Sequence, residues 1–205
     1  ILDDGRRIEA DLFIDCTGQK AVLIGTLEPR WHDWSAWLPC DRMQASFTDE
    51  TAGLPLTEAE AIRNGWRWRV PLQGRTGLAE VTAGEAASHA PDEACQTRFR
   101  NGRRATTWVG NCVAIGLSAA CLEPLEGTGL HLVQSGISKL LALFPHPGAM
   151  ALPAREYNRL MSEEVERIRD LLILHYRANR RVGEPMWDQA RQTPPPDTLA
   201  HKIRM

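Results

Sequence analysis

Residues 116–130 constrain the fold of this chain more than any other segment, because they connect a predicted buried strand to a predicted helix. The strand is the apolar run at residues 108–115, which ends at a glycine. The helix is predicted over residues 128–144, where apolar side chains recur at the spacing of a buried face and prolines follow. A strand that leads into a helix is typical of α/β folds. The predicted buried face consists of Leu130, Val133, Ile137, Leu140, Leu141 and Phe144.

A second buried strand is predicted at residues 9–15, followed by the small residues of the segment 16–18. Ligands of α/β sheets lie beyond the carboxyl ends of the strands, although an ordinary core strand has the same pattern. Residues 1–2 and 9–14 resemble a strand pair around a turn at residues 3–5, where a domain rarely starts. We therefore expect these residues to be part of a larger protein.

The middle of the chain, residues 31–106, predicts mainly antiparallel sheet. Residues 66–70 alternate tryptophan or valine with arginine, which predicts a strand with one apolar and one charged face. Pro71 is expected to end this strand, and residues 77–83 are expected to be its hairpin partner.

Two other segments of this region carry weaker signals. Residues 57–61 predict one turn of helix, with Thr57 as its N-cap and a glutamate three residues later. The polar, arginine-rich residues 91–106 are interpreted as a solvated face, because charge runs usually face water. Neither segment suggests a functional site.

The last part of the chain is predicted to be mainly helical. Residues 155–180 form one long helix in this interpretation, with Glu163 and Arg167 spaced for an ion pair. The tail from Gln192, which contains three consecutive prolines, is predicted to be extended or loop. The apolar stripe of the long helix consists of Tyr157, Leu160, Met161, Val165, Ile168, Leu172 and Tyr176.

Composition excludes several classes of protein. A formal net charge of −2 is too balanced for an electrostatic nucleic-acid binder. Every apolar run is too short to cross a bilayer, so no membrane partner is expected. Five cysteines without a C-x-x-C pair indicate reduced thiols and a cytoplasmic location. The histidines have no partner four residues away, which argues against a helical metal site. Signatures of serine hydrolases, P-loops and dinucleotide sites are absent from the sequence.

Chemistry is most strongly indicated between the strand at 108–115 and the helix that follows it. This connection carries two carboxylates, Glu123 and Glu126, and a Gly-Thr-Gly turn at residues 127–129. At the start of the helix, the backbone N–H groups of residues 128–130 are expected to be free to bind an anion. Salt-bridging or capping carboxylates are the alternative interpretation, and we interpret His131 as a packed or solvated histidine.

Four segments in this order resemble the flavin-dependent tryptophan halogenases. They are DLFIDCTG at residues 11–18, GWRWRVPL at 65–72, WVGNCVAIGL at 108–117 and EPLEGTG at 123–129. His175, Tyr176 and the PMW segment at residues 185–187 resemble further positions of the family. The resemblance extends over nearly the whole chain.

The resemblance implies an α/β fold of the flavoprotein-monooxygenase type, mixed with antiparallel sheet. Residues 1–30 would end the sheet of an FAD/NAD(P)-binding domain, and residues 107–150 would return to it with the halide loop. Residues 31–106 would form an antiparallel sheet on the substrate side, and residues 151–205 a helical C-terminal region. In that family, reduced FAD and oxygen oxidise chloride or bromide, and the hypohalous acid halogenates an aromatic ring such as that of tryptophan or indole.

The resemblance also assigns roles to residues and implies partners. A flavin reductase would supply reduced FAD transiently, the substrate would be an aromatic small molecule, and a homodimer is allowed. Glu126 resembles the catalytic glutamate of the family. The halide contacts would come from Thr128 and Gly129. The flavin contacts would come from Gly116, Leu117 and Leu130, and the family's Trp-x-Trp signature corresponds to Trp66, Trp68 and Pro71.

Departures from the family pattern leave two other interpretations open. The chain contains no glycine-rich FAD fingerprint, and none of Lys20, Lys139 and Lys202 matches the catalytic lysine, so we expect these residues alone to be inactive. The spacing from Trp66 to Glu126 is shorter than in the family. A related FAD monooxygenase or oxidoreductase without halide chemistry is one alternative, and an inactive remnant is the other.

Overall fold

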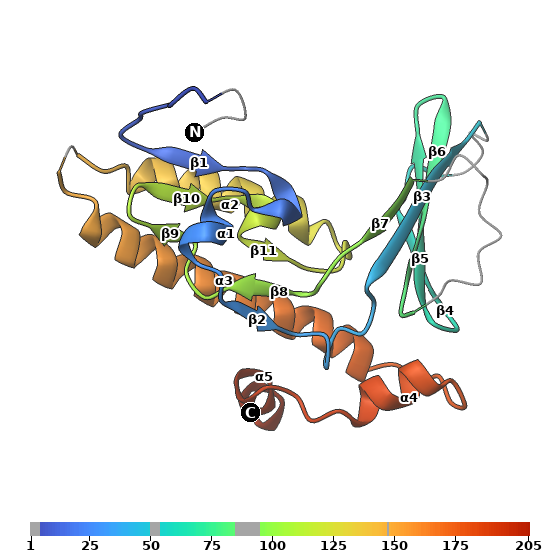
Figure 1. The fold of residues 1–205 in the computed structure, drawn as a ribbon. Helices are drawn as coiled ribbons and strands as arrows, with labels where there is room; N and C mark the ends of the chain where they lie inside the picture. The colour runs from blue at the N-terminus through green and yellow to red at the C-terminus, as the bar shows by residue number, and fades with distance from the viewer. Residues whose placement is uncertain (1–4, 50–53, 85–94, 147) are drawn as a thin grey trace. The chain divides into compact units, whose positions relative to one another are not determined.

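The computed structural model of the chain describes residues 5–49, 54–84, 95–146 and 148–205 (Figure 1). The chain divides into two compact units, and each is described by itself below. Unit 1 consists of Ile1–His32 and Gly102–Ile168, and unit 2 consists of Asp33–Asn101 and Arg169–Met205. Residues 1–4, which contain the first strand of the predicted pair and most of its turn, lie outside the described residues. No helix in the described ranges is both long enough and apolar enough to cross a membrane.

Unit 1 contains two small sheets and the helices that pack on them (Figure 1). The first sheet has the order β1-β10-β9, with β1 parallel to β10 and β9 antiparallel to it. The second has the order β11-β8-β2. The strands are β1 (Phe13–Asp15), β2 (Trp31–Asp33), β8 (Gly102–Arg104), β9 (Trp108–Val109), β10 (Cys112–Ala114) and β11 (Ala120–Cys121). The helices are η1 (Gly18–Lys20), α1 (Ile24–Leu27), η2 (Gly116–Ser118), α2 (Thr128–Ala142) and the first part of α3 (Ala151–Arg177).

The prediction of a single strand over residues 108–115 is wrong, because this segment folds into the hairpin β9–β10. Val109 pairs with Cys112, which leaves Gly110 and Asn111 as the two turn residues. Gly110 has a φ of +58°, the conformation that a type II′ hairpin turn requires at its first position. The predicted strand at residues 9–15 is confirmed, although only its last three residues pair with β10.

The core of unit 1 lies on both faces of the first sheet. On one face, Phe13, Cys112 and Ala114 pack with Ala21 and Ile24 of the segment that contains α1. On the other face, the ring of Trp108 meets that of Tyr157 from α3 edge to face, with centroids 5.5 Å apart. The strands therefore form a buried layer between helices, as an α/β fold requires.

Helix α2 is confirmed, but its predicted buried face is wrong. The buried residues follow a strict four-residue spacing, while Leu130 and Leu141 are 76% and 68% exposed. A Cβ atom at Gly136 would lie 3.1 Å from the hydroxyl of Tyr157, so this glycine allows close approach of α3. Small residues such as Gly136 therefore determine which face of α2 packs. Most apolar side chains of the predicted face lie outside this packed face. The buried residues are Thr128, Leu132, Gly136 and Leu140.

Unit 2 contains a five-stranded antiparallel sheet with the order β4-β5-β6-β3-β7 (Figure 1). The predicted antiparallel sheet is therefore confirmed, as are the strand at residues 66–70 and its hairpin partner. Strand β5 continues through Pro71, which pairs with Thr76 next to the turn. The strands are β3 (Arg42–Thr48), β4 (Glu58–Ile62), β5 (Gly65–Leu72), β6 (Arg75–Thr82) and β7 (Cys95–Arg98).

The predicted helical turn at residues 57–61 is wrong, because Glu58–Ile62 is strand β4. Ala61 lies opposite Trp66 and Glu60 lies opposite Arg67, so the alternating pattern of β4 matches the two faces of β5. Arg67 also contacts Glu80 on the other side, at 3.6 Å. Pairing with a neighbouring strand outweighs the weak local preference for a helix.

The helices of unit 2 are the last part of α3, α4 (Pro185–Gln192) and α5 (Asp197–Arg204). The apolar stripe predicted for the long helix is confirmed, since nearly all its members are buried. The predicted extended or loop tail after Gln192 is confirmed for residues 193–196 but is wrong beyond them, because α5 begins directly after the prolines. The buried carboxylate of Asp170 accepts hydrogen bonds from Thr198 and Lys202 and so holds α5.

The arginine-rich segment is only partly solvated. Arg98 and Arg100 are exposed, but Arg104 is only 9% exposed and the side chain of Arg103 is only 12% exposed. Arg103 pairs with Glu166 of α3 at 2.5 Å. Interpreting all these arginines as one solvated face is therefore wrong for the two that belong to β8. Residues 91–94 of the segment fall outside the described residues.

Candidate functional site

The segment that the sequence singled out forms a sharp corner before α2. Glu126 and Gly127 have φ values of +59° and +68°, so the chain adopts the left-handed conformation twice in succession. This conformation costs about 1–2 kcal/mol at a residue other than glycine. Glu126 is exposed and, in the described part of the chain, makes no hydrogen bond or ion pair. The corner therefore presents a carboxylate that none of the described residues neutralises.

The two glutamates of this connection have different environments. Glu123 is fully buried, whereas Glu126 is exposed at the corner. The alternative interpretation of both as salt-bridging or capping residues therefore does not describe Glu126. Backbone strain of the kind found at Glu126 clusters at functional sites.

Most of the donors expected at the start of α2 are occupied. The N–H of Thr128 donates to the carbonyl of Leu125 at 3.3 Å, and that of Leu130 donates to Gly127 at 3.1 Å. The prediction of three free donors is therefore wrong for two of them. For Gly129, the structure shows no backbone acceptor among the described residues. The hydroxyl of Thr128 donates to the carbonyl of Leu125 at 3.1 Å and is buried.

The predicted flavin contacts lie beside this corner. Gly116 begins η2 with a φ of +74°, and a Cβ atom there would lie 3.2 Å from Val133 of α2. Helix η2 therefore packs directly against α2. Leu117 and Leu130 are 44% and 76% exposed, so both present apolar surface to solvent.

A network of buried polar groups holds η2 and β1 together. The carboxylate of Asp15 accepts hydrogen bonds from the N–H and hydroxyl of Thr17 and from the N–H groups of Leu23 and Ile24, at 2.6–2.9 Å. Burial favours a raised pKa for this carboxyl, but these hydrogen bonds outweigh it and lower the pKa. Asp15 therefore stays ionised and fixes the turn after β1.

Ser118 and Arg104 extend this network. The Ser118 hydroxyl donates to the carbonyl of Asp15 at 2.5 Å. The Arg104 guanidinium donates to the carbonyls of Ser118 and Glu28 at 2.8 and 2.7 Å. Sequence reasoning missed these residues, and an aspartate followed two residues later by threonine after a strand is the signal that could have found them.

Glu28 predicts a specific acid sensitivity. Hydrogen bonds and charge from Arg30 lower the pKa of this buried carboxyl from 4.5 to about 2, despite its burial. The folded-state pKa lies below the unfolded-state value, so the stabilisation is complete above pH 4.5 and is lost as the pH falls toward 2. The side chain of Arg30 is 74% exposed, so we expect the effect to be modest. Urea unfolding of wild type and Glu28→Gln at pH 6 and pH 3 measures it, and an unchanged pH dependence in the variant contradicts it.

The predicted Trp-x-Trp signature lies on β5, in unit 2. Trp66 is 4% exposed, and Trp68 and Pro71 are half-buried. Trp187, another position of the resemblance, donates its indole N–H to the carbonyl of Ile62 at 2.7 Å and stacks on Tyr176. These positions of the resemblance therefore lie in unit 2, whereas those around Glu126 lie in unit 1.

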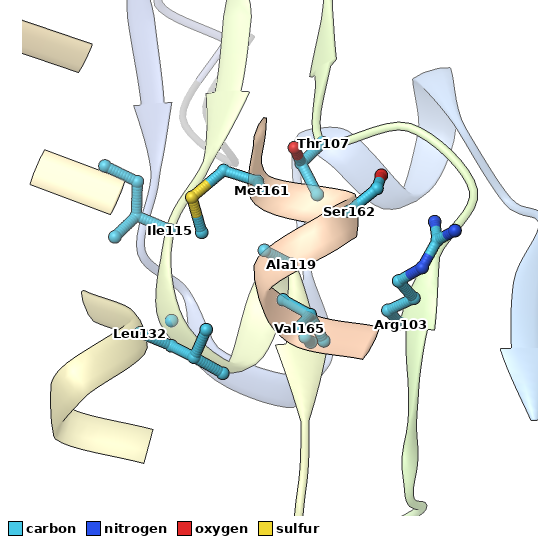
Figure 2. Close-up of a pocket in the computed structure, with 10 residues that line it drawn as sticks. Arg103, Thr107, Ile115, Ala119, Leu132, Met161, Ser162 and Val165 are labelled. Carbon is cyan, nitrogen blue, oxygen red and sulfur yellow. The ribbon is translucent and has the colours of Figure 1, made fainter. Parts of the chain in front are cut away.

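A small cavity lies between η2, α2 and α3 (Figure 2). Its volume is only about 10 Å³, roughly the space that one water molecule needs. Of the predicted site residues, only Gly116 lines it. Within the described ranges, no three His, Cys, Asp or Glu side chains are grouped as a metal site requires. The remaining walls are mainly apolar and include Ile115, Ala119, Leu132, Met161 and Val165.

The sequence profile of the tryptophan halogenase family matches residues 1–205, which is the full length of the chain. The chain belongs to the tryptophan halogenase family. It is 35% identical to tryptophan 7-halogenase KtzQ of Kutzneria sp. strain 744 over 99% of its length, and 32% identical to tryptophan 7-halogenase RebH of Lentzea aerocolonigenes over 98%. In both cases it spans only 42% of the relative.

Solved halogenase structures share the fold. BrvH, a flavin-dependent halogenase from Brevundimonas sp. BAL3, is 39% identical and superposes with a TM-score of 0.88 over 98% of this chain and 45% of its own. Xcc4156, a flavin-dependent halogenase from Xanthomonas campestris, is also 39% identical, with a TM-score of 0.91 over 100% of this chain and 44% of its own. The predicted fold class and the predicted membership of the tryptophan halogenase family are both confirmed.

Proposed function

We propose that the protein containing this chain is a flavin-dependent halogenase that chlorinates or brominates an aromatic substrate such as tryptophan or indole. The observation that carries the proposal is the corner before α2, in a chain whose whole length matches the halogenase family. There Glu126, whose carboxylate has no partner among the described residues, lies three residues before helical position Gly129, whose N–H has no backbone acceptor among them either.

The residues beside the corner fit a flavin. Gly116 has a left-handed backbone and no side chain, so a ligand could approach its backbone closely. Leu117 and Leu130 present apolar surface that a flavin ring would cover. When bound, reduced FAD would supply, with oxygen, the two-electron oxidation of halide. The residues of this chain would then position the halide and the oxidised halogen.

Gly129 is the residue that we propose to hold the halide. Its free N–H lies in the first turn of α2, where the helix dipole favours an anion. Thr128 would contribute only through the position of its backbone, because its amide and its hydroxyl already donate to Leu125. A single backbone donor distinguishes poorly between chloride and bromide, so we propose that both are used.

Glu126 is the residue that we propose to act on the oxidised halogen. Its carboxylate could polarise hypohalous acid, or stabilise the cationic ring and take up its proton. Trp66, Trp68 and Pro71 would belong to the substrate side. The proposal includes a transient flavin reductase, an aromatic small molecule, a homodimer and a cytoplasmic location.

We expect Gly129→Pro to raise the KM for chloride by roughly 10- to 100-fold, because it removes a hydrogen bond to a charged ligand worth about 1.5–3 kcal/mol. Proline is tolerated in the first turn of a helix, and nothing lies within 4 Å of a Cβ atom at this position. The measurement is product formation by the full-length enzyme at varied chloride and bromide.

Two matched variants make this test specific. Gly129→Ala keeps the N–H and should retain a nearly normal KM, and Thr128→Ser keeps the hydroxyl bond to Leu125 and should be nearly silent. A normal halide dependence in Gly129→Pro would place the halide elsewhere. An oxygenated product without halogen in the wild type would favour the related monooxygenase.

A further inference from the structure

Three side chains of α2 converge on one carboxylate of α3. The Nε2 atom of His131 lies 2.8 Å from Oε1 of Glu164. The hydroxyl of Ser135 and the ammonium of Lys139 donate to Oε2 of Glu164 at 2.6 and 2.5 Å. Residues 131, 135 and 139 are spaced by four, so they form one row along α2. Glu164 therefore holds more than two turns of α2 through a single side chain.

This carboxylate is partly buried and charged. The side chain of Glu164 is 21% exposed. Burial tends to raise its pKa, but the hydrogen bonds from Lys139, Ser135 and His131 outweigh burial and lower it. Hydrogen bonds to an ionised carboxylate are stronger than those between neutral groups. The contact is thus a firm attachment between the two helices.

His131 connects this attachment to the corner. Its backbone N–H donates to the carbonyl of Gly127 at 3.2 Å, while its imidazole contacts Glu164. Gly127 directly follows Glu126 and is the residue before α2 begins. A continuous path of two hydrogen bonds therefore leads from α3 to the residue next to the proposed catalytic carboxylate.

We propose that Glu164 and His131 are a pair of positioning residues that hold the corner at Glu126–Gly129 in its working geometry. The inference rests on the proposed function, because it assigns work to the same site. The left-handed backbone of Glu126 makes this corner strained, so it persists only if the surrounding structure fixes it. A displacement of about 1 Å at such a site can reduce a rate by about 10²-fold.

Lys139 provides the matched control. It binds the same carboxylate as His131, but it lies eight residues further along α2, roughly 12 Å away at 1.5 Å per residue. Lys139→Met and His131→Phe each remove one partner of Glu164, because neither new side chain carries a hydrogen-bond donor. If the cluster only joins two helices, the two variants should have the same consequences. If it positions the corner, only the variant at His131 should affect halide use.

The test compares steady-state kinetics of the full-length enzyme in wild type, His131→Phe, His131→Gln and Lys139→Met. We expect His131→Phe to raise the KM for chloride about tenfold and to lower kcat several-fold, with flavin affinity and aromatic KM unchanged. His131→Gln retains an N–H donor toward Glu164 and should restore most of both values. Lys139→Met should leave both values near those of wild type, with a loss of thermal stability similar to that of His131→Phe.

Two results would overturn the inference. One is equal halide KM and kcat in His131→Phe and Lys139→Met, which would make the cluster a plain helix contact. The other is a failure of His131→Gln to restore activity above that of His131→Phe. Wild-type enzyme that releases no halogenated product, by contrast, would overturn the proposed function itself, so the two failures are distinguishable.

Discussion

In the full-length protein that we propose to be a halogenase, Glu126→Gln is expected to lower kcat for halogenation by roughly 10²- to 10⁴-fold, the range that general acid–base assistance contributes. Glutamine has nearly the same size and pays the same cost for the left-handed backbone at this position. The substitution therefore removes charge and basicity with little change in shape. Glu126 is exposed, so the stability of the fold should also change little.

The measurement for Glu126→Gln is single-turnover product formation together with a flavin titration. Flavin affinity should stay normal, because the proposed flavin contacts are Gly116, Leu117 and Leu130. Glu9→Gln neutralises an exposed carboxylate elsewhere in unit 1 and serves as the control. Wild-type turnover in Glu126→Gln would mean that the carboxylate is not needed for chemistry.

Asp15→Asn is expected to destabilise the fold by about 3 kcal/mol, which is about 150-fold in the unfolding equilibrium. Each carboxylate oxygen of Asp15 accepts two hydrogen bonds. Asparagine keeps one oxygen as an acceptor, but its NH₂ group takes the place of the other oxygen. This NH₂ group would face the two donors that the lost oxygen had accepted from. Buried donors without acceptors cost about 1–3 kcal/mol each.

Chemical denaturation measures this loss of stability, and Asp11→Asn is the matched control because Asp11 lies on the same segment but is exposed. The lowered pKa of Asp15 adds a pH signature. Wild type should lose the stabilisation as the pH falls below the ordinary value of 3.8, whereas Asp15→Asn should lack this dependence. Equal stability of Asp15→Asn and Asp11→Asn would show that the hydrogen bonds of Asp15 contribute nothing net.

Secondary structure could be predicted where a periodic apolar pattern is long and unambiguous. The prediction failed for short segments whose structure depends on pairing with a neighbouring strand. The long helix α3 carries its apolar stripe over many turns, and its prediction is confirmed. Strand β4 is only five residues long, so a local helix signal competed with a partner strand that sequence patterns do not reveal. The Gly110–Asn111 turn was a readable hairpin signal inside an apolar run that looked continuous.

The candidate site could be predicted as far as residue types and their order allow. The sequence indicated the glutamate and the glycines before α2, because those residue types together are typical of a ligand-binding turn. It could not show that Thr128 and Leu130 have acceptors for their N–H groups, since this depends on how the turn closes. Burial of Leu132 in place of Leu130 was also hidden, because Gly136 and Tyr157 determine which face of α2 packs.

The left-handed backbone at Glu126 has a consequence for engineering the proposed halogenase. A glycine at position 126 would relieve about 1 kcal/mol of backbone strain, so a library screened for thermal tolerance would enrich that replacement. The same replacement would delete the carboxylate on which the proposed chemistry depends. Selection for stability would therefore favour glycine at position 126, whereas the proposed turnover requires glutamate there. A useful thermostable variant must gain its stability elsewhere in the chain.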